Sequence, residues 1–148
     1  MTFSHATDEK PTRYLRSSSA VLSVDDLKAS EAFYRTLLKM TTTVRTTSAA
    51  LLVNEGGYQL CLRELGPRAA HGLRGIGIPV VIWTATDEDD LSRCERFLRE
   101  HSRHVDTVRG DGFTLVEGCD PSGLPVVLTY PGPDRLARDR VISRVYEW

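Results

Sequence analysis

The feature that most constrains the fold of this chain is a pattern of secondary structure that occurs twice. Alternation of apolar and polar residues predicts a strand at 17–24, and Asp25 and Asp26 then supply an N-cap for an amphipathic helix over 27–38. Three further strands are expected at 41–47, 49–53 and 58–63, with a hairpin turn at 54–57. The order is strand, helix, strand, strand, strand.

The second half of the chain repeats this order at an offset of roughly sixty residues, which indicates a duplication and not a solenoid of many short repeats. A strand is expected at 78–86, followed by a helix that is capped by Thr86 and has an acidic first turn. Strands at 104–108, 112–117 and 124–130 complete the copy, and a turn with proline and glycine joins the last two. The pattern predicts an α+β protein in which two βαβββ modules form one domain.

The domain is assigned to residues 17–131, with 17–64 as the first module, 65–77 as a linker and 78–131 as the second module. Residues 1–16 form a polar leader. Residues 132–148 are predicted to be a C-terminal amphipathic helix, which needs a surface to cover. A length of 148 residues fits one domain with a single core.

Composition excludes some classes of partner. A net charge of -1 and a pI near 6.4 argue against binding to nucleic acid or to a membrane surface, because both attract positively charged proteins. No apolar run is long enough for a signal peptide or a transmembrane helix. Three widely spaced cysteines fit a reducing cytoplasm. Arginine outnumbers lysine 16 to 3, which suggests a GC-rich bacterial source.

Two segments resemble the signatures of a known superfamily. Residues 22–27 (LSVDDL), followed by Ser30, Phe33 and Tyr34, are similar to the start of the vicinal oxygen chelate superfamily of glyoxalases, bleomycin resistance proteins and extradiol dioxygenases. Residues 120–123 (DPSG), before an apolar strand, resemble its closing hairpin. The resemblance covers residues 17–131 and implies mixed sheets that curl around a shared cleft, with the helices outside.

The resemblance also implies where a divalent metal would bind, at equivalent points on the first and last strands of each module. In this sequence those points are Ser19, Cys61, Val81 and Val127. Two of them are hydrocarbon and a neutral serine hydroxyl is a poor ligand, so we expect no metal and no other cofactor. A register shift of one residue brings in Ala20, Val80, Ile82 or Val126, which are no better as donors.

The cleft is expected to be lined by alternate residues of these strands. Trp83 shares its parity with Val81, which directs it into the cleft while Ile82 and Thr84 face the helices. A largely apolar lining with a few hydrogen-bonding groups is typical of a site for an organic ligand, although such side chains could also fill the cleft or pack at a dimer interface. The expected ligand-binding residues are Ser19, Val21, Gln59, Cys61, Arg63, Val81, Trp83, Phe113, Val127 and Thr129.

The missing metal ligands favour a metal-free small-molecule binding protein, similar to the bleomycin resistance branch, that sequesters a drug or metabolite. The alternative is an enzyme of the family type, a lyase, isomerase, dioxygenase or thiol transferase, with a non-standard or absent metal site. Cys61 beside Arg63 could in principle be a nucleophile, but no base is identifiable and no catalytic residue is assigned. A third alternative is an interaction protein whose cleft is filled by its own side chains.

We expect a homodimer with two-fold symmetry. The strand edges of curled sheets need cover, and similar proteins commonly pair. The C-terminal helix also carries an apolar stripe that must be buried: Val141, Ile142, Val145 and Trp148. The expected partners are therefore a small organic ligand and a second copy of the chain.

Overall fold

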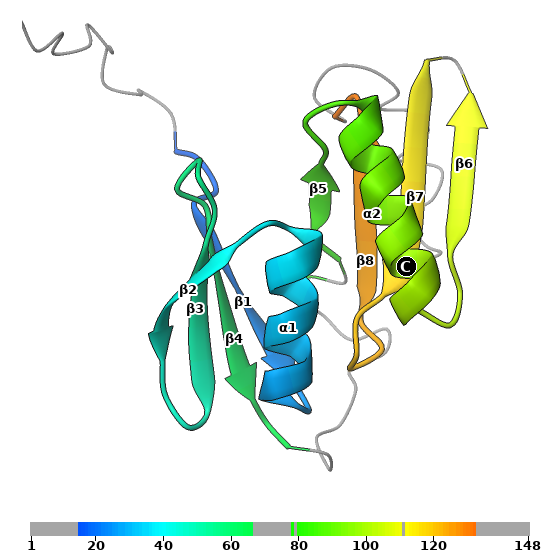
Figure 1. Cartoon of the computed structure of the whole chain (residues 1–148). Coiled ribbons are helices and arrows are strands. Elements are labelled where there is room, and N and C mark those ends of the chain that lie inside the picture. The colour runs from blue at the N-terminus through cyan, green and yellow to red at the C-terminus, as the bar shows by residue number, and fades with distance from the viewer. Residues whose placement is uncertain (1–14, 67–77, 79, 111, 133–148) are drawn as a thin grey trace, which may run out of the picture.

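The computed structural model describes residues 15–66, 78, 80–110 and 112–132, and the first module has the expected order of elements (Figure 1). It consists of β1 (Ser19–Val24), α1 (Leu27–Leu37), β2 (Thr41–Arg45), β3 (Ala49–Val53) and β4 (Gln59–Glu64). The turn predicted at 54–57 joins β3 to β4, and the Asn54 N–H donates to the carbonyl oxygen of Tyr58 at 3.1 Å. Gly57 has a φ of 86°, a left-handed conformation that glycine adopts without steric cost.

The second module repeats the order with shifted bounds (Figure 1). It consists of β5 (Ile82–Thr84), α2 (Glu88–His101), β6 (Asp106–Gly110), β7 (Phe113–Cys119) and β8 (Pro125–Tyr130). β5 is shorter than the strand predicted at 78–86, and β6 begins at Asp106 instead of residue 104. Leader residues 1–14, linker residues 67–77 and the predicted C-terminal helix from residue 133 lie outside the described residues.

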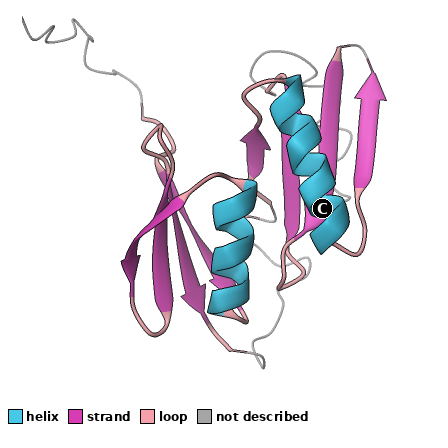
Figure 2. Cartoon of the chain, in the orientation of Figure 1, coloured by secondary structure: helices cyan, strands magenta, loops and turns pink. Residues whose placement is uncertain are grey.

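Each module forms its own four-stranded mixed sheet, in the order β1-β4-β3-β2 or β5-β8-β7-β6. The first strand of each module pairs in parallel with the last, so that Ser19 lies opposite Gln59 and Ile82 opposite Val127. The other pairings are antiparallel. Figure 2 shows both helices on the same side of the two sheets. The predicted α+β class with two βαβββ modules is confirmed.

An aspartate begins each helix. Asp26 is the N-cap of α1, and its Oδ1 accepts a hydrogen bond from the Ala29 N–H at 3.1 Å. Thr86 was expected to cap α2, but the N-cap is Asp87, whose Oδ1 accepts from the Asp90 N–H at 2.7 Å. A carboxylate also interacts favourably with the positive end of the helix dipole, which a threonine hydroxyl does only weakly.

The two helices pack side by side and join the modules. The rings of Phe33 and Phe97 lie 5.4 Å apart between centroids. Arg93 of α2 donates from its guanidinium to two carbonyls at the end of α1, those of Thr36 at 3.2 Å and Leu37 at 2.9 Å. A cation at this position satisfies carbonyls that lack a partner within the helix and complements its negative end. One core cluster therefore contains buried residues from both modules.

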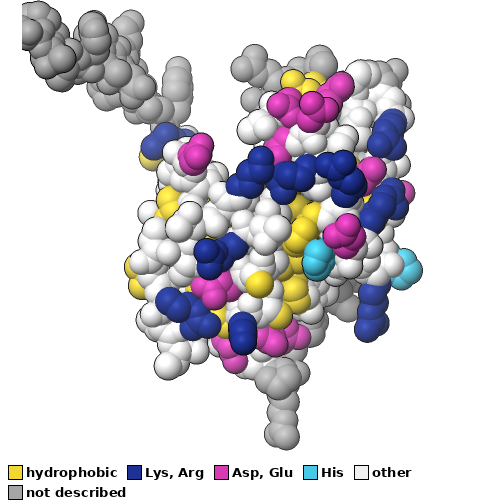
Figure 3. Space-filling model, viewed as in Figure 1, with side chains coloured by type: hydrophobic (Ala, Val, Ile, Leu, Met, Phe, Trp, Pro, Cys, Tyr) yellow, Lys and Arg dark blue, Asp and Glu magenta, His cyan; other side chains and the backbone are white. Residues whose placement is uncertain are grey.

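The outer surface of this helix layer is charged. Figure 3 shows Lys and Arg side chains as a band across the face that carries the helices, with apolar side chains exposed between α1 and α2. Arg93 and Lys39 are both paired with Asp90, at 3.1 and 3.4 Å. Arg99 and Arg109 are paired with Glu95. Acidic partners thus balance much of this positive charge.

The two segments that resemble family signatures meet at the junction of the modules. The hydroxyl of Tyr34 donates to Oδ2 of Asp120 at 2.6 Å, and Oδ1 of Asp120 accepts from the N–H groups of Ser122 and Leu124. The Ser122 hydroxyl donates to Asp25 Oδ1 at 2.7 Å. Burial raises the pKa of Asp120, and the three hydrogen bonds oppose this only in part. Burial and the neighbouring Asp120 also raise the pKa of Tyr34. The phenol therefore keeps its proton and acts as a donor.

Candidate functional site

The structure separates the ten predicted ligand-binding residues into three groups. Four of them, Ser19, Val21, Val81 and Trp83, line a cavity of about 360 Å³ between β1 and β5, which we call the β1–β5 groove. Both strands are terminal in their sheets, so each has one edge without a neighbouring strand among the described residues. The remaining lining residues are Ser17, Ala20, Leu22, Tyr34, Tyr58, Ile78, Val80, Leu124, Pro125 and Val126.

Three aromatic side chains shape this groove: Tyr34, Tyr58 and Trp83. The rings of Tyr58 and Trp83 lie 5.3 Å apart at an interplanar angle of 87°, the edge-to-face geometry that aromatic pairs prefer. In the sequence, Tyr34 lies within the amphipathic helix predicted at 27–38, and Tyr58 begins the strand predicted at 58–63. No periodicity identifies them as site residues, because the groove exists only where the two modules meet.

The orientation predicted for Trp83 is wrong. Trp83 lies opposite Leu128 and packs with it on the helix side, whereas Ile82 lies opposite Val127 on the other face of the sheet. The expected parity of β5 is therefore shifted by one residue. Trp83 still lines the groove, because β5 is the edge strand beside it.

The second group, Gln59, Cys61 and Arg63, lies on the face of the first sheet turned away from α1. The intervening residues Leu60 and Leu62 are fully buried against the helix, as the predicted alternation requires. Arg63 Nε donates to the Ser23 hydroxyl at 2.8 Å, which holds the guanidinium along the sheet. None of the three lines the β1–β5 groove.

An apolar row crosses this same face. The register places four side chains side by side across the four strands: Val21, Cys61, Leu51 and Val44. The valines at the two ends are 64% and 54% exposed. Single exposed apolar side chains are common on protein surfaces, but a continuous row of them is typical of a surface that binds another molecule.

The third group, Phe113, Val127 and Thr129, is buried on the face of the second sheet turned away from α2. Phe113 and Val127 form a small cluster with Leu115, against which Val80 and Ile82 pack. Thr129 is fully buried, and its hydroxyl has no hydrogen-bond partner in the described part of the chain. The structure therefore does not bring all ten residues together in one cleft.

The residues at the metal-equivalent positions do not fit a divalent metal. The register shows that Ile82, instead of Val81, is the partner of Val127. Ser19, Ile82 and Val127 supply neither imidazole nor carboxylate, which leaves Cys61 as the one strong donor of the set. Across residues 15–66, 78, 80–110 and 112–132, no group of three or more His, Cys, Asp or Glu side chains is placed to hold a metal ion.

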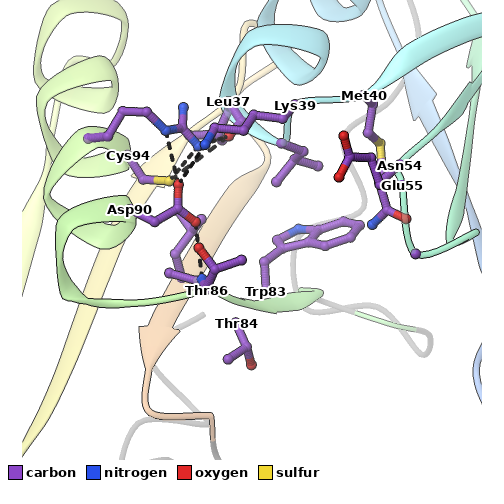
Figure 4. A pocket seen from close by; sticks show the side chains of 15 residues that line it. Leu37, Lys39, Met40, Asn54, Glu55, Trp83, Thr84, Thr86, Asp90 and Cys94 are labelled. Carbon is purple, nitrogen blue, oxygen red and sulfur yellow. Dashed lines mark hydrogen bonds and ion pairs between the residues drawn. The ribbon is translucent and has the colours of Figure 1, made fainter.

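A second pocket, of about 520 Å³, lies where the end of α1 meets α2 and the β3–β4 turn (Figure 4). We call it the helix-end pocket. Its lining is more polar than that of the β1–β5 groove, and Trp83 belongs to both. The lining residues are Leu37, Leu38, Lys39, Met40, Asn54, Glu55, Gly56, Trp83, Thr84, Ala85, Thr86, Asp90, Arg93, Cys94 and Leu128.

Asp90 is the most strongly perturbed acid of this second pocket. Partial burial acts to raise its pKa, but hydrogen bonds from the Thr86 N–H and from Arg93, with the positive charge of Arg93, lower the pKa to about 2. The Cys94 thiol beside it has a pKa raised by burial, which disfavours the reactive thiolate. Asp90 therefore serves as a fixed negative charge between two cations.

No helix in the described ranges has both the length and the apolar composition needed to cross a membrane.

The fold and the groove define a class of protein with paired βαβββ modules and a cavity at their junction. The family model of the Glyoxalase/Bleomycin resistance protein/Dioxygenase superfamily matches residues 16–128, and the chain belongs to this superfamily. A search among curated proteins finds no match.

Solved structures share the fold. A glyoxylase/bleomycin resistance protein/dioxygenase domain from Frankia sp. EAN1pec is 20% identical with a TM-score of 0.66, over 78% of this chain and 97% of that one. A glyoxalase/dioxygenase from Nostoc punctiforme is 18% identical with a TM-score of 0.62, over 81% and 93%. Lactoylglutathione lyase from Agrobacterium tumefaciens is 21% identical with a TM-score of 0.57, over 81% and 95%.

Proposed function

We propose that the protein binds a small organic molecule in the β1–β5 groove without a metal, and sequesters it as bleomycin resistance proteins do. The proposal rests on one observation: the groove is a largely apolar cavity of about 360 Å³, and the aromatic rings of Tyr34, Tyr58 and Trp83 line it. A cavity of this size and lining suits a drug-sized or metabolite-sized ligand. The absence of suitable metal donors at the family positions, argued above from their chemistry, supports binding over metal-assisted catalysis.

Ser17 and Ser19 supply hydroxyl groups at one end of the groove, and Val21, Val80 and Val126 supply apolar walls. Stacking on the aromatic rings and burial of apolar area would provide most of the affinity. The hydroxyl groups would orient the ligand. This distribution favours an aromatic or alicyclic compound with one polar end over a highly charged one.

The first test is a library of antibiotics and metabolites screened by thermal shift, because a ligand that binds only the native state raises Tm. A hit is then titrated against Val21→Asp and Val44→Asp. Both valines are exposed on the same face of the same sheet, but only Val21 lines the groove. We expect Val21→Asp to weaken binding about tenfold or more, because it places a charge beside an apolar ligand, and Val44→Asp to bind as wild type.

Two results would contradict the proposal. One is a screen in which no compound raises Tm. The other is a hit whose affinity falls equally in the two variants, which would place it outside the groove. Conversion of the hit to a product, followed by chromatography, would show an enzyme instead of a binding protein.

Assembly and location are further parts of the proposal. A homodimer is supported by the exposed apolar row on the first sheet, which a second copy of the chain would cover, and by the free edges of β1 and β5. A cytoplasmic location is supported by the three cysteines, all of which are free thiols.

A further inference from the structure

The helix-end pocket differs from the β1–β5 groove in its charges, which are separated across it. On one side are the ammonium group of Lys39 and the guanidinium group of Arg93, with Asp90 between them, so that this side carries a net positive charge. On the other side is Glu55, in the β3–β4 turn. Figure 4 shows the Trp83 ring between the Lys39 and Asp90 side and the Asn54 and Glu55 side.

The positive side is held in place by the helix ends. The guanidinium group of Arg93 donates hydrogen bonds to Asp90 and to the carbonyl oxygens of Thr36 and Leu37. These bonds fix its position and leave few N–H donors for a ligand. Within the part of the chain that the structure describes, Lys39 makes one ion pair, with Asp90 at 3.4 Å, and its side chain is 65% exposed. An ammonium group has three N–H donors. Lys39 can therefore donate to a ligand carboxylate without losing Asp90.

The negative side is available for a ligand cation. Glu55 is exposed at the rim of the pocket, and its carboxylate makes no hydrogen bond or ion pair with any residue that the structure describes. Asn54 beside it is oriented, because its Oδ1 accepts from the Tyr58 N–H at 2.9 Å. The amide NH₂ of Asn54 is thereby left to donate to a ligand carbonyl.

The floor between the two sides is apolar. It consists of the Trp83 ring with Leu37, Met40 and Leu128, all of which line the pocket. A ligand complementary to both sides and to the floor carries an anionic end, a cationic end, a carbonyl group between them and an apolar side chain. This combination is the chemistry of a short peptide.

We propose that the helix-end pocket binds a dipeptide with an apolar side chain, at a site distinct from the β1–β5 groove. The ligand carboxylate pairs with Lys39, its α-ammonium group pairs with Glu55, its peptide carbonyl accepts from Asn54, and its side chain packs on Trp83. Trp83 is shared with the groove, but Lys39 and Glu55, which recognise the two charged ends, do not line it, so the proposal does not depend on the groove function.

The test uses three forms of one ligand, measured by isothermal titration calorimetry. These are alanyl-phenylalanine, its N-acetyl form, which lacks the cation, and its C-terminal amide, which lacks the anion. We expect the free dipeptide to bind about fivefold more tightly than either blocked form, the advantage that one partly exposed ion pair provides. Equal affinity for the three forms, or no heat of binding from the free dipeptide, overturns the proposal.

Two variants then assign the ends. Glu55→Gln should abolish the advantage of the free dipeptide over its N-acetyl form and keep its advantage over the amide. Lys39→Gln should do the reverse. Lys39 has a φ of 52°, and glutamine bears the same conformational cost as lysine there, so the substitution removes the positive charge, together with its ion pair to Asp90, without adding backbone strain.

The matched controls are Glu100→Gln and Lys28→Gln, which make the same charge changes at exposed helix positions outside the pocket. Both should bind all three ligand forms as wild type does. If the controls reproduce the effects of Glu55→Gln and Lys39→Gln, the effects arise from net charge and the proposal is wrong. Superimposable circular dichroism spectra of the variants exclude a folding defect.

Discussion

A buried hydrogen bond between two side chains, Tyr34 and Asp120, links the two modules at their junction. Tyr34 and Asp120 are both almost fully buried, and the hydrogen bond between them joins α1 to the turn before β8. A buried carboxylate that loses a donor bears an uncompensated desolvation cost. This pair is therefore more sensitive to substitution than the exposed ion pairs on the helix surface.

Tyr34→Phe should destabilise the protein by about 1–3 kcal/mol, measured by urea unfolding at neutral pH. The pKa of Asp120 is already raised in the native state, so stability is lost as pH rises above the ordinary value of 3.8. Removal of the phenol donor raises this pKa further. The deficit of the variant should therefore be larger at neutral than at acidic pH. Tyr58→Phe is the control, because its hydroxyl has no hydrogen-bond partner within the described structure.

Asp90→Asn should cost about 2 kcal/mol at neutral pH, the free energy that corresponds to a pKa lowered from 3.8 to about 2. A lowered carboxyl pKa stabilises the native state above 3.8, and that contribution disappears as pH falls toward 2. The difference between the variant and wild type should shrink over the same interval. Asp89→Asn, an exposed position in the same helical turn, should cost little at any pH; equal losses in the two variants would refute the assignment.

At the scale of elements, the packing of α2 on its sheet depends on a glycine. A Cβ atom at Gly118 of β7 would lie 3.1 Å from Leu98 Cδ2 and 3.3 Å from the Ser102 hydroxyl oxygen. Leu98 is fully buried and has little freedom to move away. The absence of a side chain at this one position lets the strand approach the helix.

Gly118→Ala should therefore destabilise the protein by about 1–2 kcal/mol, the usual cost of a small overpacking, in chemical denaturation. Gly56→Ala is the matched control. Gly56 lies in an exposed turn, its φ is not left-handed, and a Cβ there has only Asn54 Oδ1 nearby, at 3.4 Å. Backbone entropy alone should make Gly56→Ala neutral or slightly stabilising, because alanine restricts the unfolded chain more than glycine does. A loss at Gly56 as large as at Gly118 would therefore contradict the assignment of the effect to contact with α2.

Strands β4 and β5 show which side-chain orientations could be predicted from the sequence and which could not. In β4, polar and apolar residues alternate, and Gln59, Cys61 and Arg63 share one face as expected, although none of them lines the β1–β5 groove. The segment before Trp83 is apolar at almost every position, so its alternation carries no information about which face is buried, and the orientation of Trp83 was missed. The groove and the helix-end pocket arise from contacts between modules, which no local pattern encodes.

For the whole molecule, the shared core predicts that the modules do not unfold separately. Buried side chains of α1 and α2 belong to one cluster, and Arg93, Tyr34 and Ser122 add polar links between the modules. Unfolding in urea should give coincident transitions by circular dichroism and by tryptophan fluorescence. Two separate midpoints would show that the modules are independent domains.

The proposed assembly is tested at the same scale. Light scattering of the intact chain at micromolar concentration should give the mass of a dimer, and removal of the residues after Pro133 should weaken it. A standard interface buries about 800 Å² on each partner, enough to cover the exposed apolar row. A monomer mass for the intact chain would reject the dimer.

The contact between Phe33 and Phe97 has a consequence for the symmetry of the fold. The same spacing along the chain separates Leu27 from Leu91, Ser30 from Cys94 and Phe33 from Phe97, so the two phenylalanines are counterparts in the duplicated modules. A residue can touch its own counterpart only near the axis that relates two copies, so their ring contact marks a pseudo-two-fold axis between the helices. Contacts of this isologous kind hold identical subunits together. The junction of this chain is therefore built like the interface between two identical subunits, with equivalent faces of α1 and α2 turned toward each other.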